Sequence, residues 1–137
     1  GRPDMAPLLF SRAVLAGRPI EVFNDGKMQR DFTHVSDIVA GILGALAHPS
    51  DEDVPHRVFN LGNHTPIELE CFIGVIEAAA GRPAHKVYKP MQPGDMVRTM
   101  ADTRRAHDAF GYAPVTPIER GLPPVVAWCR DYFGDRA

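Results

Sequence analysis

The sequence contains few of the residues that mark metal-binding or disulfide-rich proteins. Only 2 of its 137 residues are cysteines. Cys71 and Cys129 lie far apart, so they form no metal-ligand spacing and give a disulfide little support. The six histidines form no His-x-His or His-x-x-x-His pair. We therefore predict no metal site, and we expect two reduced, mostly buried thiols, as in a cytoplasmic protein.

Long apolar runs and an excess of one charge are also lacking. No apolar run approaches about 20 residues, so no helix is expected to cross a membrane. The 15 basic and 17 acidic residues give a formal charge of −2 and form no basic stripe, so no nucleic-acid partner is expected. We expect no signal peptide. The chain opens at Gly1 without an initiator methionine, which we interpret as a tag remnant or a piece of a longer protein.

Proline and glycine are plentiful, at 13 and 12 residues. Together with 45% apolar and 23% charged residues, they predict one globular unit of many short elements with abrupt ends. The hydrophobic periodicity predicts helices over 4–16, 37–47, 66–80, 103–110 and from 117 onward. It predicts strands over 20–23, 57–62 and 86–88. The fold class is therefore α/β, with short strands alternating with helices.

Several residues indicate where these helices begin. The expected N-caps are Asp4, Ser36, Thr65, Asp102 and Thr116. Thr65 and Glu68 form a capping-box pattern around a proline at the first helical position. The same tetrapeptide recurs at 116–119, and the two prolines at 123–124 must break or kink the last helix.

Few residues indicate chemistry without further context. Arg30 beside Asp31 is most simply a local salt bridge, although a guanidinium also suits phosphate oxygens. Asp37 fits a structural role in a first helical turn. Asp95 lies in an ordinary Pro-Gly-Asp turn, whose carboxylate could also bind a sugar diol. No tyrosine has a lysine placed to depress its pKa, and neither a nucleophile elbow nor Gly-x-Gly-x-x-Gly is present.

Taken together, the motifs resemble one family. Their order and spacing are similar to those of UDP-glucuronate 4-epimerases, which are NAD-dependent isomerases of nucleotide-sugar metabolism in the extended short-chain dehydrogenase/reductase family. The matching strings are Gly1–Ala6, Ile20–Asn24, Arg30–Ile38, Phe59–Gly62, Gln92–Asp95, Ala101–Thr103, Gly111–Tyr112 and Ile118–Leu122. The first string, Gly-Arg-Pro-Asp-Met-Ala, points to the glucuronate branch.

The resemblance covers only the C-terminal part of such an enzyme. It implies that 1–137 is a C-terminal nucleotide-sugar-binding lobe that lacks the Rossmann core. The Tyr-x-x-x-Lys pair and the glycine-rich turn are absent, so no catalytic or NAD-binding residue is assigned to this chain. The strand near 57–62 and the helix near 37–47 are expected to pack on the missing NAD domain. Without that domain, the chain is expected to be inactive and to self-associate.

The resemblance also assigns the UDP-sugar contacts. The residues implied are Arg2, Val22, Phe23, Arg30, Gln92 and Asp95. Arg30 would pair with the diphosphate, Asp95 would hold the ribose hydroxyls, and Val22 and Phe23 would flank the uracil. Arg2 would face the uronate, and Gln92 stands where many relatives have a second arginine.

The function implied is the UDP-sugar-binding part of a cytoplasmic, homodimeric 4-epimerase that interconverts UDP-glucuronate and UDP-galacturonate with NAD. Two alternatives stay open. One is a related dehydratase or decarboxylase, similar to UDP-xylose synthase. The other is a non-catalytic UDP-sugar-binding module.

Overall fold

The structure is a computed structural model that describes residues 5–51 and 56–134. Its elements, in chain order, are α1 (Ala6–Ala16), β1 (Pro19–Phe23), the 3-10 turn η1 (Asn24–Gly26), β2 (Gln29–Arg30), α2 (Val35–Ala47), β3 (Ile67–Glu68), α3 (Leu69–Ala80), β4 (His85–Lys89), α4 (Arg104–Phe110), α5 (Ile118–Gly121) and α6 (Pro123–Phe133). No described helix is long and apolar enough to cross a membrane. The expected cap Asp4 lies outside the described residues, and Met5 occupies the N-cap of α1.

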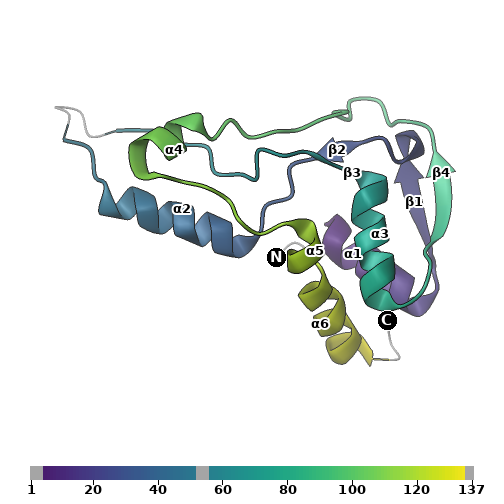
Figure 1. The fold of residues 1–137 in the computed structure, drawn as a ribbon. Helices are drawn as coiled ribbons and strands as arrows, with labels where there is room; N and C mark the ends of the chain where they lie inside the picture. The colour runs from purple at the N-terminus through teal and green to yellow at the C-terminus, as the bar shows by residue number, and fades with distance from the viewer. Residues whose placement is uncertain (1–4, 52–55, 135–137) are drawn as a thin grey trace.

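Helices α1, α3, α5 and α6 pack together with β1 and β4 into one body (Figure 1). Its core contains the fully buried Phe72 and Ile76 of α3 and Val126 of α6. A second cluster joins Ile20 and Val22 of β1 to α3. These contacts bury the apolar face that the sequence predicts for α3, because its residues recur at helical spacing.

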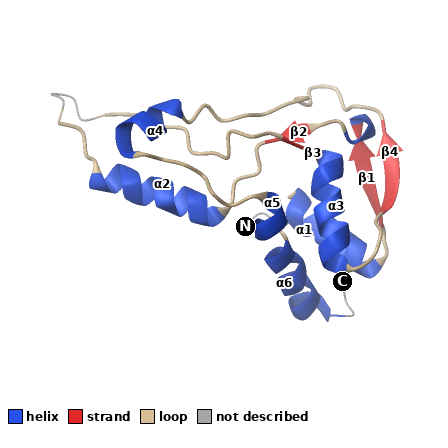
Figure 2. Ribbon diagram, in the orientation of Figure 1, coloured by secondary structure: helices blue, strands red, loops and turns tan. Residues whose placement is uncertain are grey.

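Two small sheets belong to this body. β1 pairs with β4 in parallel, from Pro19 opposite His85 to Phe23 opposite Lys89. β2 pairs with β3 antiparallel, with Gln29 opposite Glu68 and Arg30 opposite Ile67. Short strands between helices confirm the predicted α/β class (Figure 2).

Helices α2 and α4 form an arm with residues 56–62, and the arm extends away from the body (Figure 1). Gly41 and Gly44 allow α2 to pack closely inside the arm, since added Cβ atoms would lie 2.7 Å from Leu61 Cδ2 and Phe110 Cδ2, respectively. The other side of α2 is apolar and exposed. We call Val39, Ile42, Leu43 and Leu46 the α2 apolar face; they are 47%, 48%, 60% and 73% exposed.

Two predicted helix starts are wrong. α2 begins at Val35, and its N-cap is His34, whose Nδ1 accepts a hydrogen bond from the Ser36 amide at 3.2 Å. The capping box at Thr65 does not form, because Ile67 and Glu68 pair with β2 and the helix starts only at Leu69. Tertiary pairing therefore overrides the local capping signal.

Two other helix starts and one strand also differ from expectation. Thr116 bonds to Asp37 instead of capping, and Pro117 is the N-cap of α5. Asp102 accepts a hydrogen bond from the Arg104 amide, although Thr103 holds the N-cap position of α4. The described residues of 57–62 form no strand, since no described strand pairs with them. The predicted break at the two prolines is confirmed by the separate helices α5 and α6.

The thiols differ from each other. Cys129 is buried, as expected, but Cys71 is exposed on α3. Both cysteines are free. The described residues contain no group of three or more histidine, cysteine or acidic side chains that could hold a metal ion.

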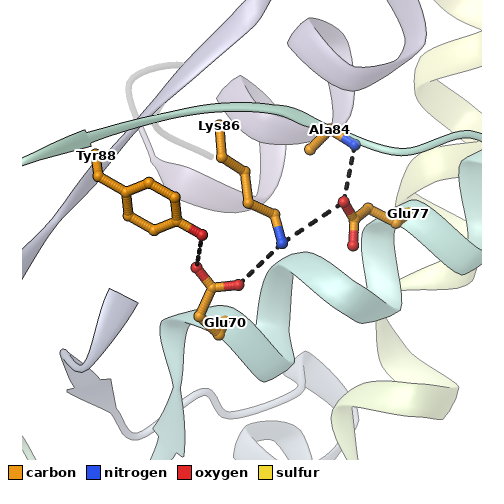
Figure 3. A network of polar contacts seen from close by, with 5 residues as sticks. All are labelled: Glu70, Glu77, Ala84, Lys86 and Tyr88. Atoms are coloured by element: carbon orange, nitrogen blue, oxygen red, sulfur yellow. Dashed lines mark hydrogen bonds and ion pairs between the residues drawn. The ribbon is translucent and has the colours of Figure 1, made fainter. Parts of the chain in front are cut away.

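A polar network joins α3 to β4 and thereby supports β1 (Figure 3). Glu70 accepts hydrogen bonds from Lys86 Nζ and from Tyr88 Oη, each at 2.9 Å. Glu77 lies 3.6 Å from the same Nζ and accepts a hydrogen bond from the Ala84 amide. Partial burial raises the pKa of Glu70, but the hydrogen bonds from Lys86 and Tyr88 outweigh it, so the net pKa is lowered.

Replacing Glu70 by glutamine is expected to reduce the free energy of unfolding by about 1 kcal/mol at neutral pH, because the charge-assisted bonds are lost. The pKa of Glu70 is lower in the folded chain. The ionised Glu70 therefore contributes to the free energy of unfolding at a pH above the ordinary pKa of a glutamate. This contribution is lost as the pH falls through the lowered pKa of the folded chain. Urea unfolding of both proteins should show the difference shrinking as the pH falls below the ordinary pKa of a glutamate. A pH-independent difference would contradict this account.

Candidate functional site

A cavity of about 380 Å³ opens where α1, β1, β2 and the loop 95–99 meet. Its lining combines apolar side chains with a few polar ones, as small-molecule sites do. Phe23 and Phe10 contribute rings, Arg30 a guanidinium and Asp95 a carboxylate. The fold thus brings together residues from four separate segments of the chain.

Arg30 supplies the cation of this cavity. It ends β2, and the ladder with β3 holds its backbone. Its Nη1 donates to the Gln29 carbonyl at 2.9 Å, and the side chain is half-buried. Among the described residues, Arg30 makes no ion pair, not even with the adjacent Asp31. The predicted local salt bridge is therefore wrong, and the guanidinium retains hydrogen-bonding capacity for an anionic ligand.

Two other predicted residues line the same cavity. The ring of Phe23 comes from the carboxyl end of β1, and Asp95 comes from the turn after Gln92. No described residue donates a hydrogen bond to the Asp95 carboxylate, so its oxygens are available to hydroxyl groups.

The remaining predicted residues lie elsewhere. The Val22 side chain is fully buried in the core, which leaves only its backbone to face a ligand. Gln92 is exposed and does not line the cavity. Arg2 lies outside the described residues.

Asp31 also lines this cavity, and sequence analysis assigned it only a salt bridge. Its carboxylate instead accepts hydrogen bonds from the backbone amides of Asn63, His64 and Ala101, at 2.8, 3.2 and 2.8 Å. Its own amide donates to Thr99 Oγ1 at 3.4 Å. In the sequence, Asp31 stands out only by its place in the Arg-Asp-Phe string. That string does not reveal hydrogen-bond donors that lie so far along the chain.

Tyr88 and Tyr112 are not activated as acids or bases. Burial raises the pKa of Tyr112, whose hydroxyl donates to the Gly62 carbonyl at 3.0 Å. The hydrogen bond to Glu70 raises the pKa of Tyr88. Neither has the depressed pKa that a catalytic phenolate needs at neutral pH.

A second cavity, of about 530 Å³, lies between the start of α2 and helices α5 and α6. Its lining contains no aspartate, glutamate, lysine or arginine, and its polar groups come from Thr33, His34 and Thr116. The smaller cavity is therefore the candidate site, because it alone of these two presents opposite charges to a ligand.

Comparison with protein-family models matches residues 2–62 to the NAD dependent epimerase/dehydratase family. The chain is 38% identical, over 144 residues, to a probable UDP-glucuronate 4-epimerase of Rhizobium meliloti, covering 93% of this chain and 42% of that protein. It is 39% identical to an uncharacterized 37.6 kDa protein of Escherichia coli O111:H-, covering 97% and 44%. The chain thus spans about two fifths of the length of these relatives.

Solved structures show the same similarity in three dimensions. The crystal structure of a Bacillus cereus UDP-glucuronic acid 4-epimerase with UDP-glucuronic acid and NAD matches with a TM-score of 0.84 and 27% identity, over 96% of this chain and 41% of that one. MoeE5, in complex with UDP-glucuronic acid and NAD, matches with a TM-score of 0.82 and 31% identity, over 96% and 43%. The described fold is therefore the one found in part of these epimerases.

Proposed function

We propose that this chain belongs to the NAD dependent epimerase/dehydratase family, whose model matches residues 2–62. We further propose that it forms the UDP-sugar-binding part of a UDP-glucuronate 4-epimerase, the kind of protein to which it is similar in sequence and fold. The cavity lined by Arg30 and Asp95 carries the proposal. The half-buried Arg30 has no ion-pair partner among the described residues, and no described residue donates a hydrogen bond to the Asp95 carboxylate. Relatives with the same fold hold UDP-glucuronic acid and NAD.

The diphosphate, the ribose and the uracil of a UDP-sugar can each contact one group in the cavity. The guanidinium of Arg30 can donate to diphosphate oxygens, where charge-assisted hydrogen bonds are strong. Asp95 can accept hydrogen bonds from both ribose hydroxyls, and the Phe23 ring offers an apolar face to the uracil. Binding then concentrates on the nucleotide and leaves the sugar free to turn between hydride removal and return.

NAD supplies the transient oxidation of the sugar in the proposed reaction. We propose that it binds outside this chain, because the 137 residues contain neither a Gly-x-Gly-x-x-Gly turn nor a Tyr-x-x-x-Lys pair. The chain by itself is then inactive, and its own contribution is to bind and orient the UDP-sugar. The uronate contact of Arg2, a cytoplasmic location and a homodimeric parent stay predictions.

The arm supports our proposal for the domain organisation. The α2 apolar face is exposed, and the backbone of 58–61 makes no hydrogen bond to another described backbone group. Proteins normally cover an exposed apolar helix face and a segment whose backbone groups are unpaired. We propose that both pack on an NAD-binding domain that accounts for the greater length of the relatives.

Replacing Arg30 by alanine is expected to weaken UDP binding by about 10- to 100-fold, which is the value of one or two charge-assisted hydrogen bonds. Isothermal titration calorimetry of the 137-residue chain with UDP measures this effect. Arg98→Ala is the matched control, because Arg98 lies on the adjoining segment but does not line the cavity. The absence of saturable binding by the unmodified chain, or equal effects of the two substitutions, would contradict the proposal.

The dehydratase or decarboxylase alternative differs in its product. A chain that includes the NAD-binding part, supplied with UDP-glucuronate, should yield UDP-galacturonate if it is the epimerase. A UDP-pentose would instead identify the decarboxylase.

A further inference from the structure

The Asp31 carboxylate lies where three distant segments of the chain meet. Its Oδ1 accepts from the Asn63 amide, and its Oδ2 accepts from the His64 and Ala101 amides. Gly62 permits this close approach, since a Cβ there would overlap Ala101 and lie 2.9 Å from Asp31 Oδ2. A carboxylate with three backbone donors has little capacity left for a ligand.

The segment that Asp31 holds is the one that follows Asp95. The Gln29 amide donates to the Val97 carbonyl at 2.8 Å, and the Thr99 amide donates to the Gln29 carbonyl at 3.1 Å. The Asp31 amide extends this alignment by donating to Thr99 Oγ1. The two backbone hydrogen bonds at Gln29 together form an isolated parallel bridge to Arg98. Arg30 Nη1 adds a longer hydrogen bond to the Val97 carbonyl, at 3.5 Å. Because these contacts between the two described segments are few, the Asp31 contacts are a large part of what fixes their register.

From these contacts we infer that Asp31 is a positioning residue of the UDP-sugar site. It locks residues 97–101 alongside β2 and so places Asp95 across the cavity from Arg30. The carboxylate acts through the backbone and does not touch the ligand. This inference rests on the proposed function for its effect on UDP binding, but the alignment itself does not depend on the ligand.

Asparagine is the informative replacement, because it keeps the shape of the side chain. In either orientation its NH2 group faces at least one backbone N–H, so at least one of the three hydrogen bonds is lost. Gly62→Ala should displace the same segments without altering the carboxylate.

The test is a double-mutant cycle in UDP binding, measured by calorimetry on the 137-residue chain. Asp31→Asn is expected to weaken UDP binding about tenfold in the unmodified chain and less than twofold in the Asp95→Ala background. A purely structural role would reduce affinity equally in both backgrounds, and equal losses would overturn the inference. Gly62→Ala should behave as Asp31→Asn does.

Amide hydrogen exchange tests the alignment without a ligand. Asp31→Asn is expected to speed exchange at the Gln29, Thr99 and Ala101 amides by about tenfold or more, relative to the amides of α3. Unchanged exchange at these sites would overturn the inference. If the unmodified chain does not bind UDP, the proposed function fails, and the exchange result alone decides whether Asp31 holds the segment in place.

Discussion

Replacing Leu43 and Leu46 by glutamate is expected to convert the 137-residue chain from a self-associating species into a monomer. Both side chains belong to the α2 apolar face, where they are 60% and 73% exposed. A contiguous apolar surface of this kind is uncommon on monomeric proteins and favours association. The two introduced carboxylates would have to lose their hydration in any contact through this face, and this cost opposes association.

Size-exclusion chromatography with light scattering measures the outcome. Trp128→Glu is the matched control, because Trp128 is a comparably exposed apolar residue, at 49%, on α6 and away from the arm. The control should still associate. A monomeric unmodified chain, or association that survives the double substitution, would contradict the proposed docking role of α2.

Much of the fold could be predicted from local sequence signals. The ends of α1, α3 and α4 follow from Gly17, Gly81 and Gly111, which adopt the left-handed conformation that favours glycine, with φ of 68°, 73° and 70°. Helix starts were less predictable, because they depend on tertiary contacts. The capping box at Thr65 is a strong local pattern, yet the pairing of Ile67 and Glu68 with β2 delays the helix.

The candidate site could be predicted only in part. Family resemblance pointed to Phe23, Arg30 and Asp95, and the structure gathers these three around one cavity. The role of Asp31 could not be predicted, because its hydrogen-bond donors lie 32, 33 and 70 residues further along the chain. No local pattern encodes which backbone amides a carboxylate will reach after folding.

A second carboxylate, Asp37, joins the arm to the body in a similar way. It is 3% exposed in the first turn of α2. It accepts hydrogen bonds from the Val115 and Thr116 amides and from Thr116 Oγ1, each at 3.1 Å. The structural role expected for Asp37 is confirmed, but its partners tie α2 to the segment that leads into α5.

Replacing Asp37 by alanine is therefore expected to lower the free energy of unfolding by about 3 kcal/mol, because three donors, two of them buried, lose their acceptor at once. Urea denaturation followed by circular dichroism measures the loss. Asp108→Ala is the control, since that side chain is 80% exposed and its removal should cost less than about 1 kcal/mol. Similar small effects of both substitutions would show that the arm is held chiefly by its apolar contacts, and that the Asp37 hydrogen bonds contribute little to stability.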